Sequence, residues 1–378
     1  MKVIKSFDRK IERKNFDCRI KALQGLLRHY DIESSLYMTM VLSESISFRY
    51  STVDFEGFPV SHVPFAFATR SDVEKKIFDS LGLLYVMEEI DDSPSGWEKM
   101  KSLIDKETPI LVKIDGNFVN RLSSSQKPNE QGMKVGHLST LLLVGYSEED
   151  KKYVALTEFL ENDRIIPFAL DRVQKARKSI CFPYSPNFIC LYLKEPPNSK
   201  KINNLMTEKG ILSLKKISRS MIDPTSIKDD FVDDIAEEGF TCTNIRNGIP
   251  AMKALCRDLQ ELLVFYDHCG ENADKILILL AQLLRSNLSL GGPSAFRFEF
   301  GECLKEMGKN LNKGELSIIG GEFTHLSFAW KKFIFQLRET AKKAHPREYL
   351  QKAIEIFTQI IENEEVLFSK LSNLLVKM

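Results

Sequence analysis

Two residues far apart in the sequence have side chains suited to covalent acyl chemistry at sulfur. Cys18 begins a helix-like run over residues 18–30, and His137 follows Gly136 at the start of an apolar, strand-like run. The helix is predicted from apolar positions at helical spacing, namely Ile20, Leu23, Leu27 and Tyr30. A thiol at a helix N-terminus and an imidazole at the mouth of a strand are groups that together make a thiolate nucleophile.

The position of Cys18 favours ionisation of its thiol. A free cysteine has a pKa of about 8.5, and the N–H groups and positive dipole end of a helix N-terminus stabilise the anion. Asp17 or Asn15 can cap this helix. Taken alone, Cys18 is better explained as a small buried residue, and His137 is explained at least as well as a hydrogen-bonded strand-end histidine. Their occurrence together, in this order, favours catalysis.

A third residue is needed to orient the imidazole. The run 138–144 and the run 153–157 flank a polar turn, which predicts a hairpin whose returning strand ends at Thr157 and Glu158. Glu158 can accept a hydrogen bond from His137, and Thr157 can do so more weakly. The alternative for Glu158 is a solvated charge. Asp115, at the end of the run 109–114, is another acid near this edge, and a structural role is the expected one for it.

The pattern of apolar residues predicts two domains of different class. The first, residues 1–197, contains helices at about 71–81 and 94–105, with Ser71 as a cap and Pro94 in a first turn, and strands at 109–114, 138–144, 153–157 and 188–193. Residues 194–204 are predicted to be a linker. The second domain, residues 205–378, has helical periodicity, so the expected fold class is α+β followed by all-α. The acidic stretch 223–238 is expected to be an exposed crossover.

Composition excludes several classes of function. Lys and Arg total 53 against 52 Asp and Glu, which argues against a nucleic-acid-binding protein. No apolar run is long enough to span a membrane, and the first residues lack a leader-like apolar core, so we expect a cytoplasmic protein. The 7 cysteines show no Cys-x-x-Cys spacing, and we expect reduced thiols, no metal and no bound cofactor.

Two further sequence features have ordinary explanations. The segment around Cys18 is locally basic, which is typical of a solvated face and would also suit an acidic protein partner. Gly291 and Gly292 are followed by Pro293, a pattern that predicts a helix C-cap and a proline at the first position of the next helix.

The ordered motifs resemble the family of butirosin biosynthesis protein H. Asp17 to Tyr30 is similar to its cysteine-containing helix, Pro109 to Asp115 to its central strand, and Gly136 to Tyr146 to its histidine strand. In the second half, the Gly291-to-Arg297 segment and the helix containing Trp330 are similar to the family's later motifs.

This resemblance implies a papain-like N-terminal domain with helices and an antiparallel sheet, followed by a helical domain. It implies acyl transfer from the phosphopantetheine thioester of an acyl or peptidyl carrier protein to a small amine, in natural-product or antibiotic biosynthesis. Cys18 would be the nucleophile and His137 the base. The sequence departs from papain-like relatives at the third position, where Thr157 and Glu158 replace the usual Asp or Asn.

Two alternatives stay open at this point. One is a cysteine peptidase or amidase, in which water is the acyl acceptor. The other is a binding protein that keeps the fold without catalysis. The oligomeric state is also open, with a homodimer as one alternative.

Overall fold

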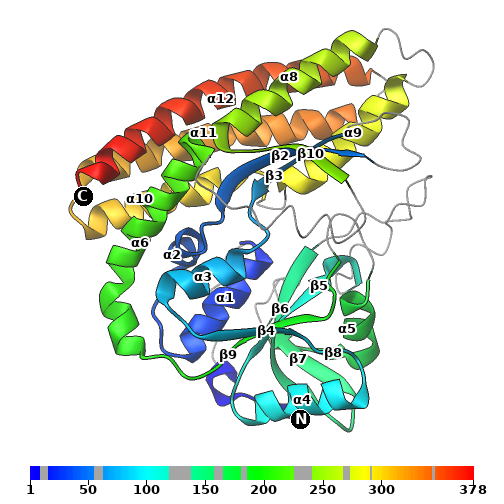
Figure 1. Ribbon diagram of the computed structural model, residues 1–378, viewed down its shortest axis with the longest axis vertical. Coiled ribbons are helices and arrows are strands. Elements are labelled where there is room, and N and C mark those ends of the chain that lie inside the picture. Colours follow the sequence, from blue (N-terminus) through cyan, green and yellow to red (C-terminus); the bar gives the residue numbers. More distant parts are fainter. Residues whose placement is uncertain are drawn as a thin grey trace. The chain divides into compact units, whose positions relative to one another are not determined.

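The chain forms two compact units, described from a computed structural model (Figure 1). The structure describes residues 1–8, 16–54, 63–118, 138–156, 165–179, 185–224, 241–266, 273–289, 292–342 and 345–378. Unit 1 comprises Met1–Thr39 and Ile77–Met206, and unit 2 comprises Met40–Lys76 and Thr207–Met378. Residues 40–76 thus cluster with the C-terminal unit, whereas the sequence grouped them with the first domain. The boundaries 1–197 and 205–378 stay a prediction.

Unit 1 is organised around a seven-stranded sheet whose strand pairs are antiparallel. The order is β4-β9-β5-β6-β7-β8, and β1 also pairs with β6. The bounds are β1 Lys2–Val3, β4 Tyr85–Glu89, β5 Ile110–Asp115, β6 Leu138–Ser147, β7 Lys152–Leu156, β8 Ile165–Ala169 and β9 Ile189–Leu193. The predicted hairpin is confirmed as β6 and β7, which pair through Tyr146 and Tyr153. β6 is a central strand, and its side chains from Leu141 to Val144 are fully buried, which accounts for its apolar sequence.

Helices pack against this sheet. α1 (Cys18–His29) packs on β6, α4 (Pro94–Asp105) packs on β5 and β6, and α5 (Leu170–Arg177) packs on β5, β7 and β8. Pro94 is in the first turn of α4, as predicted, and Ser93 caps that helix by accepting a hydrogen bond from the Gly96 N–H at 3.1 Å.

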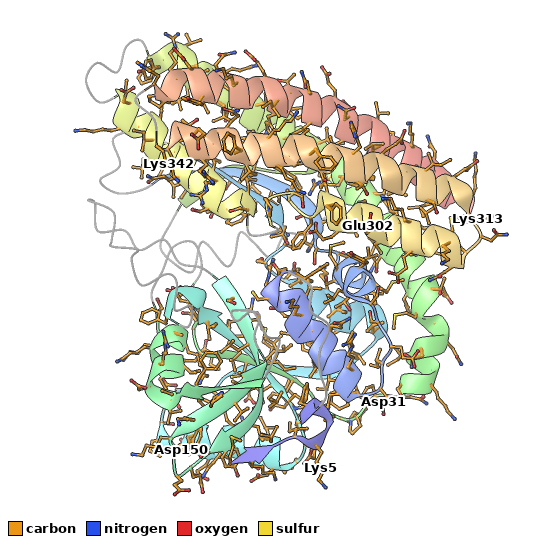
Figure 2. The ribbon with its side chains drawn as sticks, turned by 180° about the vertical axis from the view of Figure 1, so that it is seen from behind. Lys5, Asp31, Asp150, Glu302, Lys313 and Lys342 are labelled. Atoms are coloured by element: carbon orange, nitrogen blue, oxygen red, sulfur yellow. The ribbon has the colours of Figure 1, made fainter. Side chains whose placement is uncertain are left out.

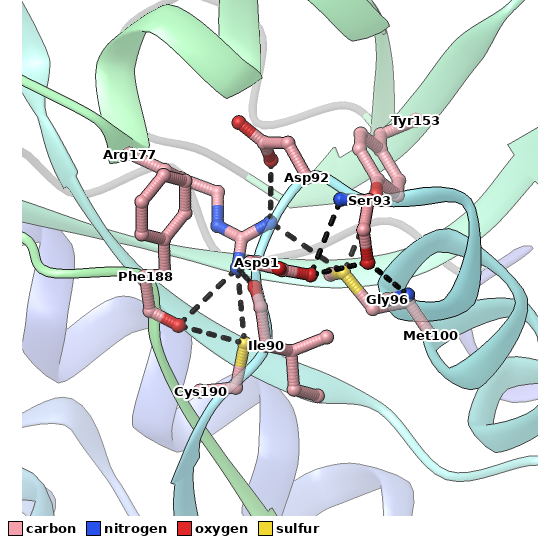
Figure 3. A network of polar contacts seen from close by, with 10 residues as sticks. All are labelled: Ile90, Asp91, Asp92, Ser93, Gly96, Met100, Tyr153, Arg177, Phe188 and Cys190. Atoms are coloured by element: carbon pink, nitrogen blue, oxygen red, sulfur yellow. Dashed lines mark hydrogen bonds and ion pairs between the residues drawn. The ribbon is translucent and has the colours of Figure 1, made fainter.

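A buried arginine joins α5 to the sheet (Figure 3). Arg177 is fully buried, and its guanidinium donates to the carbonyl oxygens of Ile90 and Phe188, the second at 3.2 Å. It also contacts Asp92 at 3.4 Å and the Cys190 sulfur at 3.5 Å. Burial raises the pKa of the Cys190 thiol to about 11, which favours its protonated form.

Replacing Arg177 with lysine tests this network. A lysine ammonium cannot reproduce the planar set of donors, so carbonyl groups are left unpaired in the interior. We expect the free energy of unfolding to fall by about 1–3 kcal/mol. Urea denaturation followed by circular dichroism measures it, and a midpoint equal to that of the wild type would refute the structural role.

Unit 2 combines a small sheet with long helices. β2 (Ile46–Asp54) lies between β3 (Val63–Thr69) and β10 (Thr241–Asn247), and both pairs are antiparallel. The helices are α8 Gly248–Tyr266, α9 Ala273–Leu288, α10 Arg297–Asn310, α11 Gly314–Thr340 and α12 Pro346–Val376. In Figure 2, Lys313 and Lys342 mark the two ends of α11. α2 (Leu36–Leu42), α3 (Val73–Leu81) and α6 (Ser199–Ile222) cross the division between the units.

Aromatic side chains form the core of unit 2. Phe48 of β2 lies 6.1 Å from Trp330 and 5.9 Å from Phe357, measured between ring centroids. Gly301 and Gly320 let α10 and α11 approach closely, because a Cβ at Gly301 would lie 2.5 Å from the Gly320 carbonyl oxygen.

The predicted fold class is confirmed, since antiparallel sheet dominates the N-terminal half and helices dominate the C-terminal half. β10 is one strand within the otherwise helical half. The predicted linker 194–204 is wrong beyond residue 198, because α6 begins at Ser199. Asn198 caps it by accepting from the Lys201 N–H at 3.1 Å, directly after two prolines. Over the described ranges, no helix combines the length and apolarity needed to cross a bilayer.

Candidate active site

Cys18 is the first residue of α1, as the sequence predicted. Asp17 is the N-cap, and its Oδ1 accepts hydrogen bonds from the N–H groups of Arg19 at 2.8 Å and Ile20 at 3.4 Å. This resolves the choice between Asp17 and Asn15 as the capping residue. The Asp17 cap fixes the direction in which the chain enters the helix, and so fixes where Cys18 is presented.

An ion pair adjoins the cysteine. The Arg19 guanidinium contacts both carboxylate oxygens of Asp17 at 3.1 Å, and the two side chains are each 5% exposed. A bidentate pair of this kind holds both groups in one geometry. The negative charge of Asp17 next to Cys18 is therefore offset by the guanidinium.

The sulfur of Cys18 contacts the central strand β6. The Ser139 hydroxyl donates a hydrogen bond to Cys18 Sγ at 2.9 Å. Cys18 is 8% exposed and Ser139 is fully buried. The contact joins residues 121 positions apart and shows that α1 lies with its first residue against the beginning of β6.

The other predicted catalytic residues lie outside the described residues. His137 directly precedes β6, while Thr157 and Glu158 directly follow β7. Of the predicted set, only Cys18 is therefore placed. The roles of His137, Thr157 and Glu158 stay predictions.

Asp115 has a buried structural partner. It ends β5, it is 2% exposed, and the Ser179 hydroxyl donates to its Oδ2 at 2.9 Å. Asp115 pairs with Leu138, whereas Ser139 pairs with Ile114. Since successive side chains in a strand alternate between faces, Asp115 and Ser139 belong to opposite faces. This arrangement agrees with the structural role expected for Asp115.

His29 and Lys2 have structural partners. His29 Nδ1 shares a 2.6 Å hydrogen bond with the Ser6 hydroxyl, and its ring stacks on Phe7. Burial lowers the pKa of the His29 imidazole. Lys2 of the basic N-terminal segment pairs with Asp105 at 2.9 Å. Among the described residues, no group of three or more His, Cys, Asp or Glu side chains is placed to hold a metal ion.

Within residues 292–297, the structure differs from the prediction that Pro293 begins the next helix. Helix α10 begins at Arg297 rather than at Pro293, and Phe296 before it has a left-handed φ of 62°. Arg297 is fully buried and pairs with Glu364 of α12 through Nε at 2.7 Å. Arg297, and not Pro293, is therefore the first residue of α10, and its ion pair joins α10 to α12.

Sequence reasoning missed Ser139. Its signal was its position two residues after His137, the spacing that puts side chains on one face of an extended strand. A hydroxyl two residues after His137 can contact the same group that His137 was predicted to meet, namely the Cys18 sulfur.

The fold and the site define an α+β protein whose helix-terminal cysteine is buried against a central antiparallel strand. Residues 17–155 match the model of the family described as butirosin biosynthesis protein H, N-terminal. The predicted resemblance is thus confirmed over residues 17–155, while the resemblance of the Gly291-to-Arg297 segment and of the Trp330 helix stays a prediction. The match includes Cys18, β5 and β6 and ends within β7. A comparison with curated proteins finds no match.

Proposed function

We propose that this protein is a cysteine-dependent acyltransferase with a papain-like N-terminal domain. It would form an amide between an acyl group, delivered as a carrier-protein thioester, and a small amine. The observation that carries the proposal is the position of Cys18, at the N-terminus of α1 and in contact with β6. The matched family, named for the biosynthesis of butirosin, supports a biosynthetic role.

The proposed base is His137, the residue directly before β6. His137 precedes Ser139 by two positions, the spacing that puts side chains on one face of an extended chain, and Ser139 contacts the sulfur. Glu158, or Thr157, is proposed to orient the imidazole.

The first half-reaction moves the acyl group to the protein. His137 takes the thiol proton, and the Cys18 sulfur attacks the thioester carbonyl carbon. The Cys18 N–H, at the N-terminus of α1, is the donor proposed for the oxyanion. The bond to the phosphopantetheine sulfur then breaks, and that sulfur leaves with the proton from His137.

The second half-reaction forms the product. The amine nitrogen attacks the acyl-enzyme carbonyl carbon and gives a proton to His137. The bond between that carbon and Cys18 Sγ breaks, the amide is released, and the sulfur recovers the proton. The phosphopantetheine arm belongs to the partner carrier protein and acts as a substrate.

Product analysis separates transfer from hydrolysis. Acyl-N-acetylcysteamine thioesters, which mimic the end of the phosphopantetheine arm, would be incubated with the full chain and a panel of primary amines. We expect an amide product by mass spectrometry, with a rate of thioester consumption that rises with amine concentration. Free acid released at a rate indifferent to amine would instead establish a hydrolase and refute the transfer proposal.

A further inference from the structure

The Ser139 hydroxyl donates to the Cys18 sulfur from a buried position on a central strand. Its hydroxyl lies 2.9 Å from Sγ, and the side chain is fully buried. Ser139 pairs with Ile114 within the sheet, so its backbone is held on a central strand. A donor fixed in this way needs little reorganisation when the acceptor gains charge.

The direction of this hydrogen bond decides its effect. An O–H group that donates to sulfur interacts more strongly with a thiolate than with a thiol, because bonds to a charged partner are about twice as strong as neutral ones. A hydroxyl in this position therefore favours the anionic form.

The N-terminus of α1 alone stabilises a Cys18 thiolate less than the sequence suggested. The N–H groups of Arg19 and Ile20, the first of the helix after Cys18, both bond to the Asp17 carboxylate. That carboxylate also places a negative charge in the same turn, offset by Arg19. A further donor aimed at the sulfur thus matters more here than at a helix end whose amides are open to the nucleophile.

We propose that Ser139 is a positioning residue that fixes the Cys18 sulfur against β6 and favours its ionised form. This role rests on the proposed function, in which Cys18 is the nucleophile. Ser139 keeps its own proton throughout, while the thiol proton goes to His137.

The test is the pH dependence of Cys18 alkylation by iodoacetamide, which requires no acyl transfer. The rate is measured from about pH 5 to 10 by mass spectrometry of the peptide that contains Cys18, in the full chain. In Ser139→Ala we expect the midpoint of the profile to move up by about one pH unit, with alkylation at pH 7 slowed about 5- to 10-fold.

Ser147→Ala is the matched control. Ser147 is a buried serine at the far end of the same strand, and it donates to Asp150 at 3.1 Å, away from Cys18. Its profile should superimpose on that of the wild type. If Ser139→Ala does not fold, Ser139→Thr and Ser139→Val are compared instead. These two side chains have similar shapes, but only threonine keeps the hydroxyl, so Ser139→Thr should retain the wild-type midpoint.

The possible results separate this inference from the proposed function. A Ser139→Ala profile that superimposes on the wild type overturns the role of Ser139, even if acyl transfer is found. A shifted profile in a protein that forms no acyl adduct supports the role of Ser139 and refutes the acyltransferase.

Discussion

Replacing Cys18 with alanine is expected to abolish thioester turnover. The variant lacks the atom that carries the acyl group, so both half-reactions are lost rather than slowed. For a nucleophile that acts together with a base, the expected loss is at least about 10³-fold in kcat. The measurement is amide formation from an acyl-N-acetylcysteamine thioester and an amine, compared with the wild type at equal protein concentration.

Cys256→Ala is the matched control for this prediction. Cys256 is also a buried free cysteine, but it lies on α8 of unit 2, and its sulfur is 3.4 Å from the Thr358 hydroxyl. Its loss should leave kcat within about twofold of the wild type, since the substitution only removes a sulfur from a helix contact. Full turnover in Cys18→Ala, or equal losses in both variants, would contradict the assignment of the nucleophile.

Replacing Glu364 with glutamine is expected to destabilise the protein strongly. Glu364 is fully buried and accepts from Arg297 at 2.7 and 2.9 Å and from the Trp330 indole N–H at 2.7 Å. The substitution leaves the Arg297 charge in the interior without its counter-ion. Removal of one partner from a buried pair costs about 3–5 kcal/mol, which is a large part of the stability of most domains.

The control for this prediction removes both charges. In Arg297→Met with Glu364→Leu, no uncompensated charge remains, so the loss in the free energy of unfolding should be smaller than in Glu364→Gln alone. Guanidinium denaturation followed by tryptophan fluorescence suits the measurement, because Trp330 is part of the network. A single variant as stable as the wild type would show that the pair does not stabilise unit 2.

Local patterns in the sequence identified the elements that hold the cysteine. The apolar spacing after Cys18 predicted α1, and Asp17 was one of two predicted caps, because both are properties of adjacent residues. The runs that became β5, β6 and β7 were predictable for the same reason, since each is apolar and bounded by turn residues.

Contacts between distant residues were not predictable from such patterns. β2 alternates Phe48 and Tyr50 with Arg49 and Ser51, yet all four side chains are buried, so its polar positions gave no sign of a central strand. Its partner β10 follows almost 200 residues later, as the pair Thr52 and Thr243 illustrates with a separation of 191.

Polar contacts between distant residues were equally hard to predict, both in unit 2 and at the site. Arg297 resembled an ordinary residue after a helix start, because its partner Glu364 is 67 positions away. Ser139 was overlooked because its contact Cys18 lies 121 positions earlier, and its spacing from His137 was the local signal that pointed to it. Only the packing of α1 on β6 brings these two residues together.

The most direct test of the central claim is the intact mass of the full chain after incubation with an acyl-N-acetylcysteamine thioester and no amine. We predict a mass increase equal to one acyl group, located on the peptide that contains Cys18, absent in Cys18→Ala and removed when an amine is added. An acyl group found on Cys190, Cys256 or Cys303, or no adduct on Cys18 while thioester is consumed, would contradict covalent catalysis by this cysteine.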